Sequence, residues 1–108
     1  MNKVIIKGSV FTPKDSLEYA DAGVVSKQIL TNKAGNITIF SFDKEQGLSE
    51  HTAPFDATVY ILEGTAKITL GGTPFTLKQG EAIIMPANMP HALLAEEKFK
   101  MMLLMIKG

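Results

Sequence analysis

Cysteine is absent from the 108-residue chain. The chain therefore has no disulfide, thiol nucleophile or thiolate metal site, and any bound metal must rely on histidine and carboxylate side chains. An excess of charge is missing too, since eleven Lys and Arg residues balance eleven Asp and Glu residues without a basic cluster. Without the long-range field that attracts nucleic acid or anionic lipid, we expect neither as a partner.

Long hydrophobic runs are also lacking. The apolar run of residues 4–6 ends at Lys7 and is too short for a secretory core, and no window approaches a membrane span. We therefore expect a cytoplasmic protein with no membrane contact. Apolar residues make up 45% of the chain and charged residues 20%, which suits one hydrophobic core and a single domain over residues 1–108.

Short segments rich in β-branched and aromatic residues alternate with turn signals along the chain. In residues 66–70 the apolar side chains alternate with Lys67 and Thr69, so one side of this strand faces a core and the other faces water. The pair Gly71–Gly72 then suits a two-residue hairpin loop. We expect an all-β sandwich or barrel of about eight to ten short antiparallel strands, with almost no helix. The expected strands are residues 4–11, 24–30, 37–42, 58–62, 66–70, 82–85, 91–95 and 99–106, with an extended segment over 51–55, a resumed apolar face at 75–77 and one helical turn within 14–23.

His51 and His91 are the only histidines in the chain, and each lies near a proline and before a β-like apolar run. The surroundings of His91 resemble the second motif of the cupin superfamily, G-x5-P-x-G-x2-H-x3-N. Gly80, Pro86 and His91 fall on their motif positions. Asn88 stands where glycine is usual, and Ala95 replaces the closing asparagine.

The first cupin motif, G-x5-H-x-H-x3/4-E-x6-G, is matched from its closing glycine, Gly64. His51 then takes the first histidine position, while Ala53 and Ala57 replace the second histidine and the glutamate. Gly47 lies two residues nearer to His51 than the opening glycine of the pattern. Two of the four usual metal ligands of the family are therefore absent.

The resemblance implies a cupin barrel, that is, a jelly roll or double-stranded β-helix. The barrel motifs lie within residues 37–106, and the strands of residues 1–30 are expected at the edge or at a dimer interface. Because an unpaired edge is commonly covered by another chain, we expect a homodimer.

The resemblance also implies a metal site at His51 and His91, for a divalent ion such as Zn, Ni, Mn or Fe. Such a site needs three or four protein ligands, and two histidines with one carboxylate form the minimum for a non-haem iron centre. Asp56 is the carboxylate nearest to the missing glutamate, although strand alternation places it on the opposite face from His51 unless the strand bends. Gln28 is a further candidate ligand.

Small alanines in place of polar ligands favour a ligand pocket over a closed metal centre. The residues expected to line the pocket are His51, Ala53, Ala57, Val59, Met85, His91 and Leu93.

Three functions fit this pattern. The first is a module that binds a small organic ligand, such as a carbohydrate-derived or carboxylated metabolite, with at most a weakly held metal at the two histidines. The second is a metal-dependent cupin enzyme of the isomerase, lyase or dioxygenase type. The third is a dimeric scaffold without an open pocket. The sequence offers no nucleophile to accompany the imidazoles, so it identifies no catalytic residue and favours binding over catalysis.

Overall fold

The computed structural model describes residues 4–107, so residues 1–3 and 108 of the expected domain lie outside the described part. Nine strands and one 3-10 turn make up its regular structure. They are η1 (Pro13–Asp15), β1 (Val24–Asn32), β2 (Gly35–Phe42), β3 (Gly47–His51), β4 (Asp56–Glu63), β5 (Thr65–Leu70), β6 (Thr73–Lys78), β7 (Ala82–Met85), β8 (His91–Leu94) and β9 (Phe99–Ile106). No helix within residues 4–107 is long and apolar enough to cross a membrane.

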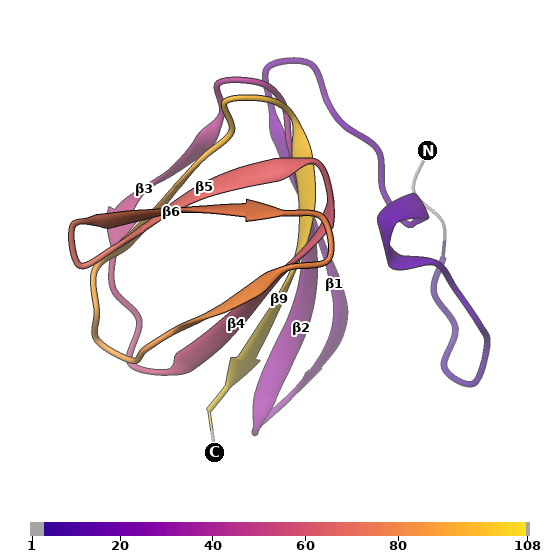
Figure 1. Ribbon diagram of the computed structural model, residues 1–108. Helices are drawn as coiled ribbons and strands as arrows, with labels where there is room; N and C mark the ends of the chain where they lie inside the picture. Colours follow the sequence, from indigo (N-terminus) through magenta and orange to yellow (C-terminus); the bar gives the residue numbers. More distant parts are fainter. Residues whose placement is uncertain (1–3, 108) are drawn as a thin grey trace.

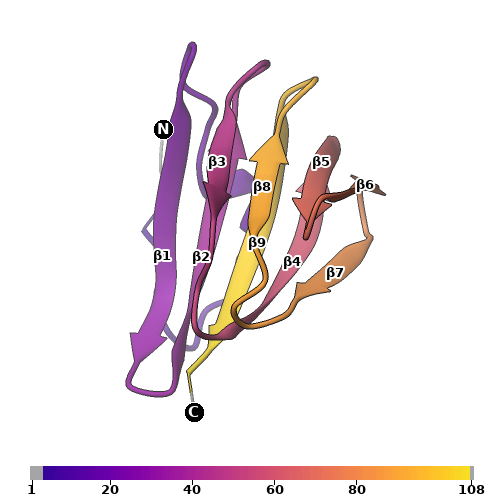
Figure 2. The same ribbon diagram turned by 90° about the vertical axis from the view of Figure 1, so that its left-hand side faces the viewer.

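The strands form two antiparallel sheets that face each other as the walls of a barrel (Figure 1). The five-stranded sheet has the order β1-β2-β9-β4-β7, and the four-stranded sheet has the order β3-β8-β5-β6. Figure 2 shows β3, β8 and β5 of the smaller sheet side by side. The expected all-β jelly-roll architecture is confirmed.

The hydrophobic core lies between the inner faces of the two sheets. Phe42 of β2 stands opposite Phe99 of β9, and their rings stack with centroids 4.6 Å apart. Next to them, Met101 of β9 stands opposite Ile61 of β4. Strand alternation sends the chain neighbours of these inward-facing residues to the outer face. Tyr60, the neighbour of Ile61, is exposed there, as alternation predicts.

The prediction of a strand over residues 4–11 is wrong. This segment, named the arm here, has no ladder partner and instead contains a turn in which the Ser9 N–H donates to the Ile6 carbonyl at 3.1 Å. Gly8 has φ +86 at the third position of this turn, a conformation that favours glycine. Apolar composition alone therefore did not produce a strand, because a strand also needs a neighbour to pair with.

Residues 14–22, named the strap here, cross the outer face of the five-stranded sheet. Leu17 has no exposed surface and anchors the strap. Three side chains of the sheet donate hydrogen bonds to strap carbonyls: Lys27 Nζ to Ser16 at 3.0 Å, Ser41 Oγ to Glu18 at 3.0 Å and Lys100 Nζ to Lys14 at 2.6 Å. The expected helical turn within residues 14–23 is reduced to the short η1, which begins before the strap.

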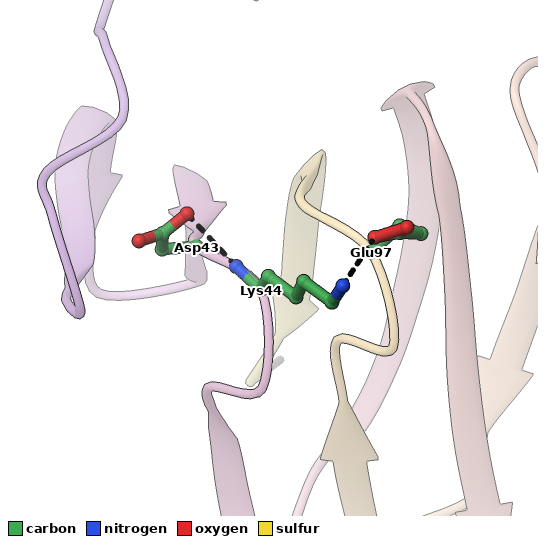
Figure 3. Close-up of polar contacts among 3 residues, drawn as sticks. All are labelled: Asp43, Lys44 and Glu97. Carbon is green, nitrogen blue, oxygen red and sulfur yellow. Dashed lines mark hydrogen bonds and ion pairs between the residues drawn. The ribbon is translucent and has the colours of Figure 1, made fainter.

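The turn between β2 and β3 is held by Asp43 (Figure 3). Its carboxylate accepts hydrogen bonds from the backbone N–H of Ala22 at 2.7 Å and of Lys44 at 2.9 Å, and these donors lower the pKa of Asp43. Lys44 Nζ lies 3.7 Å from Glu97 of the β8–β9 turn. Both side chains of this ion pair are exposed, so it contributes little to stability.

Candidate functional site

The two histidines meet at one end of the four-stranded sheet. His51 ends β3, His91 begins β8, and they stand opposite each other in the antiparallel ladder. Their Nε2 atoms are 3.0 Å apart, and the rings meet edge to face with centroids 4.2 Å apart. His91 is 7% exposed, whereas His51 is exposed, so solvent reaches the pair from one side.

His91 points into the barrel because it shares a strand face with Leu93, a member of the hydrophobic core. His51 reaches it from a strand end that is irregular: the register between β3 and β8 shifts between Leu48 and His51. Such a shift re-aims side chains at the end of a strand.

Both rings are oriented by main-chain carbonyl groups two residues earlier in the chain. His51 Nδ1 lies 2.7 Å from the Ser49 carbonyl oxygen, and His91 Nδ1 lies 3.2 Å from the Met89 carbonyl oxygen. Because a carbonyl oxygen only accepts hydrogen bonds, each Nδ1 carries the proton and each Nε2 presents a lone pair. Two lone pairs at 3.0 Å need a shared proton, a hydrogen-bond donor or a cation between or beside them.

The loop that precedes His91 is held to the loop that follows His51. The Asn88 N–H donates to the Ala53 carbonyl at 2.7 Å, and Asn88 has φ +66. Asparagine tolerates this left-handed conformation better than other side chains do, although less well than glycine. The sequence alone flagged Asn88 only as a departure from a motif glycine, and the backbone conformation explains why that exchange is accepted.

Four of the remaining predicted pocket residues belong to the hydrophobic core, and Ala53 does not. Ala57 and Met85 stand opposite each other in the β4–β7 ladder, and both belong to the core together with Leu93 and Val59. Val59 has no exposed surface, and Ala53 is half-buried. Neither histidine lines the hollows of about 420 and 450 Å³ on the described part of the chain, nor two smaller ones of about 330 and 220 Å³.

The two proposed additional ligands do not join the histidines. Asp56 is exposed and stands opposite Ile106, and β4 keeps a regular register from Asp56 to Ile61, so alternation turns this carboxylate to the outer face. Its Oδ1 accepts a hydrogen bond from the Ala87 N–H at 2.8 Å. Gln28 is exposed on β1, in the other sheet.

These positions decide how well the residues present suit a metal ion. A separation of 3.0 Å lets both Nε2 atoms reach one ion at the usual bond length of about 2.0–2.1 Å. Within residues 4–107, however, no group of three or more His, Asp or Glu side chains is placed to hold a metal. The donor set therefore does not fit the four-ligand metal centre that the motifs of the family imply.

A polar cluster outside the barrel was missed by sequence reasoning. The Tyr19 hydroxyl of the strap donates to Glu63 Oε2 at 2.6 Å, and the Tyr19 ring lies 4.8 Å from Lys98 Nζ and 5.0 Å from Lys100 Nζ. Burial, followed by the hydrogen bond and charge of Glu63, raises the pKa of Tyr19. These residues are far apart in sequence, and the charged ones stand where the sequence pattern indicates turns and solvated loops. Their contacts fasten the strap and lie away from the histidine pair.

Comparisons with known proteins agree with this architecture. The cupin domain family matches residues 38–107, which include both histidines. The crystal structure of SPY1581, a Streptococcus pyogenes protein of unknown function, is 35% identical over 96% of this chain and 91% of that chain, with a TM-score of 0.90. A cupin 2 conserved barrel domain protein from Leptotrichia buccalis is 42% identical over 87% of this chain and 46% of that chain, with a TM-score of 0.85.

A cupin superfamily protein from Desulfitobacterium hafniense, at 24% identity and a TM-score of 0.89, shares the fold over 98% of this chain and 97% of that chain. No curated protein matches the chain. The family match covers well over half of the chain, from within β2 through β9, and includes both histidines. The chain belongs to the cupin family.

Proposed function

We propose that this cupin binds a small organic ligand at the end of the barrel where His51 and His91 meet. The observation that carries the proposal is the 3.0 Å approach of two Nε2 atoms whose partner nitrogens are both engaged by carbonyl groups. The pair offers acceptors to a ligand hydroxyl, and with one shared proton it offers a positive charge to a carboxylate. A carbohydrate-derived or carboxylated metabolite supplies such groups.

A divalent metal at this pair is proposed only as a weak occupant, because two imidazoles fall short of the three protein ligands of a stable site. The metal-dependent enzyme alternative lacks a third ligand among residues 4–107, since Asp56 faces outward and Gln28 lies on the other sheet. The scaffold alternative is favoured by one observation, the packed core that includes Ala57, Met85 and Leu93. We also propose that the chain forms a homodimer.

Calorimetric titration tests the binding proposal. The full chain is titrated with Ni²⁺, Zn²⁺ and Mn²⁺ separately, and with hexuronic and aldonic acids. We expect weak metal binding and measurable binding of at least one acid, both lost in His91→Ala and reduced in His51→Gln. Glu50→Gln, an exposed neighbour of His51 on β3, is the matched control and should bind as the parent chain does.

The results separate the alternatives. If protein purified without chelator carries about one equivalent of metal, and His91→Ala loses it, the metal-dependent enzyme alternative is favoured. That result would contradict the proposal that a metal binds only weakly at the histidine pair. If the parent chain binds none of the acids or metals, and His91→Ala folds as the parent does, the result would contradict the binding proposal and favour the scaffold alternative. Long-range ¹H–¹⁵N spectra of the imidazoles provide a direct check, since both rings should carry their proton on Nδ1 in the neutral state.

A further inference from the structure

The inner face of the five-stranded sheet changes from apolar to polar along its first two strands. On β2, the core residue Phe42 and the partly buried Phe40 share their face with Thr38, because the side chains of a strand alternate between faces. Gln28 of β1 stands opposite Thr38 in the ladder and therefore lies on that face too. The apolar interior thus gives way to a hydroxyl and an amide, and these two residues, Gln28 and Thr38, are named the polar wall here.

The polar wall lies at the same end of the barrel as the histidine pair. A short turn connects β2 to β3, and Figure 1 shows these two strands on opposite walls of the barrel. Thr38 lies four residues before the end of β2. His51 lies four residues after the start of β3. Because both strands rise by about the same distance per residue from the shared turn, the two side chains reach the same level from opposite sheets.

Both side chains of the polar wall are available to a ligand. Thr38 is half-buried, Gln28 is exposed, and neither side chain has a hydrogen-bond partner within residues 4–107. The same row of the sheet continues from Thr38 to Leu103 of β9 and then to Val59 of β4. No charged side chain stands in this row, so the wall offers neutral hydrogen-bond donors and acceptors beside an apolar surface. Such groups suit hydroxyl groups, which also donate and accept.

We propose that the polar wall selects ligands that carry hydroxyl groups in addition to the group held by the histidine pair. This inference rests on the proposed function, and it makes the ligand a hydroxylated carboxylic acid rather than a plain one. Packed sheets lie about 10 Å apart, so a six-carbon acid with its carboxylate at the histidines brings its hydroxyl groups to the opposite wall. There they donate to the Gln28 amide oxygen and accept from the Thr38 hydroxyl.

Calorimetric titration with matched acids tests the selection. The full chain is titrated with gluconate and galacturonate, which carry hydroxyl groups, and with hexanoate, which has the same number of carbons and no hydroxyl group. We expect at least one hydroxylated acid to bind about tenfold more tightly than hexanoate, because it gains two hydrogen bonds at the wall. Thr38→Val and Gln28→Met should each weaken that binding about three- to tenfold and leave hexanoate binding unchanged.

The chain offers a matched control for each variant. Thr58→Val changes a half-buried threonine on the outer face of β4, and Gln79→Met changes an exposed glutamine in the β6–β7 turn. Both should bind the acids as the parent chain does. Valine has the shape of threonine and suits a strand, so Thr38→Val keeps the fold.

The results separate this inference from the function on which it rests. If the hydroxylated acids bind no more tightly than hexanoate, or if Thr38→Val and Gln28→Met bind them as the parent does, the selection by the polar wall is overturned while the binding proposal stands. If none of the three acids binds, the proposed function is itself contradicted and the selection is overturned with it.

The side-chain amide of Gln28 reports the contact directly. In ¹H–¹⁵N spectra, the hydroxylated acid that binds should shift the Gln28 side-chain signal, whereas the Gln79 side-chain signal should stay in place. The shift should disappear in His91→Ala, because the acid is then no longer held at the histidine pair. A Gln28 signal that does not move while calorimetry shows binding would overturn the contact.

Discussion

Tyr19 is the residue whose ionisation is most strongly tied to the folded state. Its hydroxyl donates to Glu63 Oε2, and burial and the nearby carboxylate both disfavour the phenolate, so its pKa is raised. The folded state therefore retains a proton that the unfolded state releases near pH 10. The stabilisation is fully present below that pH and is lost as pH rises toward the folded-state pKa.

We predict that Tyr19→Phe removes this alkaline dependence. The free energy of unfolding, measured with urea from pH 7 to 11, should fall with pH more steeply above about pH 10 in the parent chain than in Tyr19→Phe. At pH 7 the variant should lose about 1 kcal/mol with the hydrogen bond. Tyr60→Phe, which changes an exposed tyrosine on the outer face, is the control. Parallel curves for the parent and Tyr19→Phe would contradict the prediction.

The meeting of His51 and His91 was predictable at the residue scale, because motif spacing fixes which strand ends carry them. Strand alternation also predicted correctly that Asp56 would face away. The proton positions on the imidazoles were not predictable, because they depend on where the Ser49 and Met89 carbonyls point. The depth of Ala57 was missed as well: replacing a polar ligand with alanine let this position join the core.

Among the elements, the β4–β5 turn depends on glycine for two separate reasons. Gly64 has φ +79, and a Cβ there would lie 2.6 Å from the Lys98 carbonyl oxygen and 3.0 Å from Phe99 Cβ. Gly72, in the β5–β6 hairpin, has φ +86, but a Cβ added to it would have no atom within 4 Å. Only Gly64 of these two therefore combines a left-handed backbone with close contact to the segment leading into β9.

We predict that Gly64→Ala destabilises the fold much more than Gly72→Ala. Both substitutions cost about 1 to 2 kcal/mol for a left-handed alanine. Gly64→Ala must in addition displace the backbone at Lys98, so its loss of unfolding free energy should be larger by at least ~1 kcal/mol. Chemical denaturation of both variants measures the difference. If both variants lose the same unfolding free energy, the prediction is contradicted, because the β8–β9 turn would then move away from the added Cβ at no energetic cost.

The accuracy of strand prediction differed between elements for a physical reason. The limits of β7 and β9 matched the expected residues 82–85 and 99–106, because proline, glycine and charged turns mark their ends. The arm has strand-like composition too, yet it forms no strand. Composition reports the side chains of a segment, whereas pairing depends on which other segments are left with an open edge.

On the scale of the whole molecule, the fold was accessible from sequence, while the exposed surfaces were not. Alternation and the two motifs define a barrel with inner and outer faces. Which part of the outer face stays bare depends on where the strap docks, and that docking rests on Leu17 and on three side chains from the sheet. The sequence of residues 14–22 contains no local pattern that predicts these contacts.

We predict that the thermal stability of the molecule depends on its concentration. For a folded dimer that unfolds to single chains, each tenfold dilution should lower the melting temperature by roughly 3 to 5 °C. Differential scanning calorimetry at two concentrations measures the melting temperature. A parent chain with an unchanging melting temperature would contradict the prediction.

The hydrogen bond between Lys100 Nζ and the Lys14 carbonyl joins positions 86 residues apart. During synthesis at about 5 to 20 residues per second, Lys14 is added to the chain roughly 4 to 17 s before Lys100. The strap contacts of Lys27 and Ser41 become available earlier, because β1 and β2 precede β9 in the chain. Lys14 can form its hydrogen bond to the sheet only after β9 has been synthesised. One of the first segments to be translated is therefore among the last to complete its contacts with the outer face of the barrel.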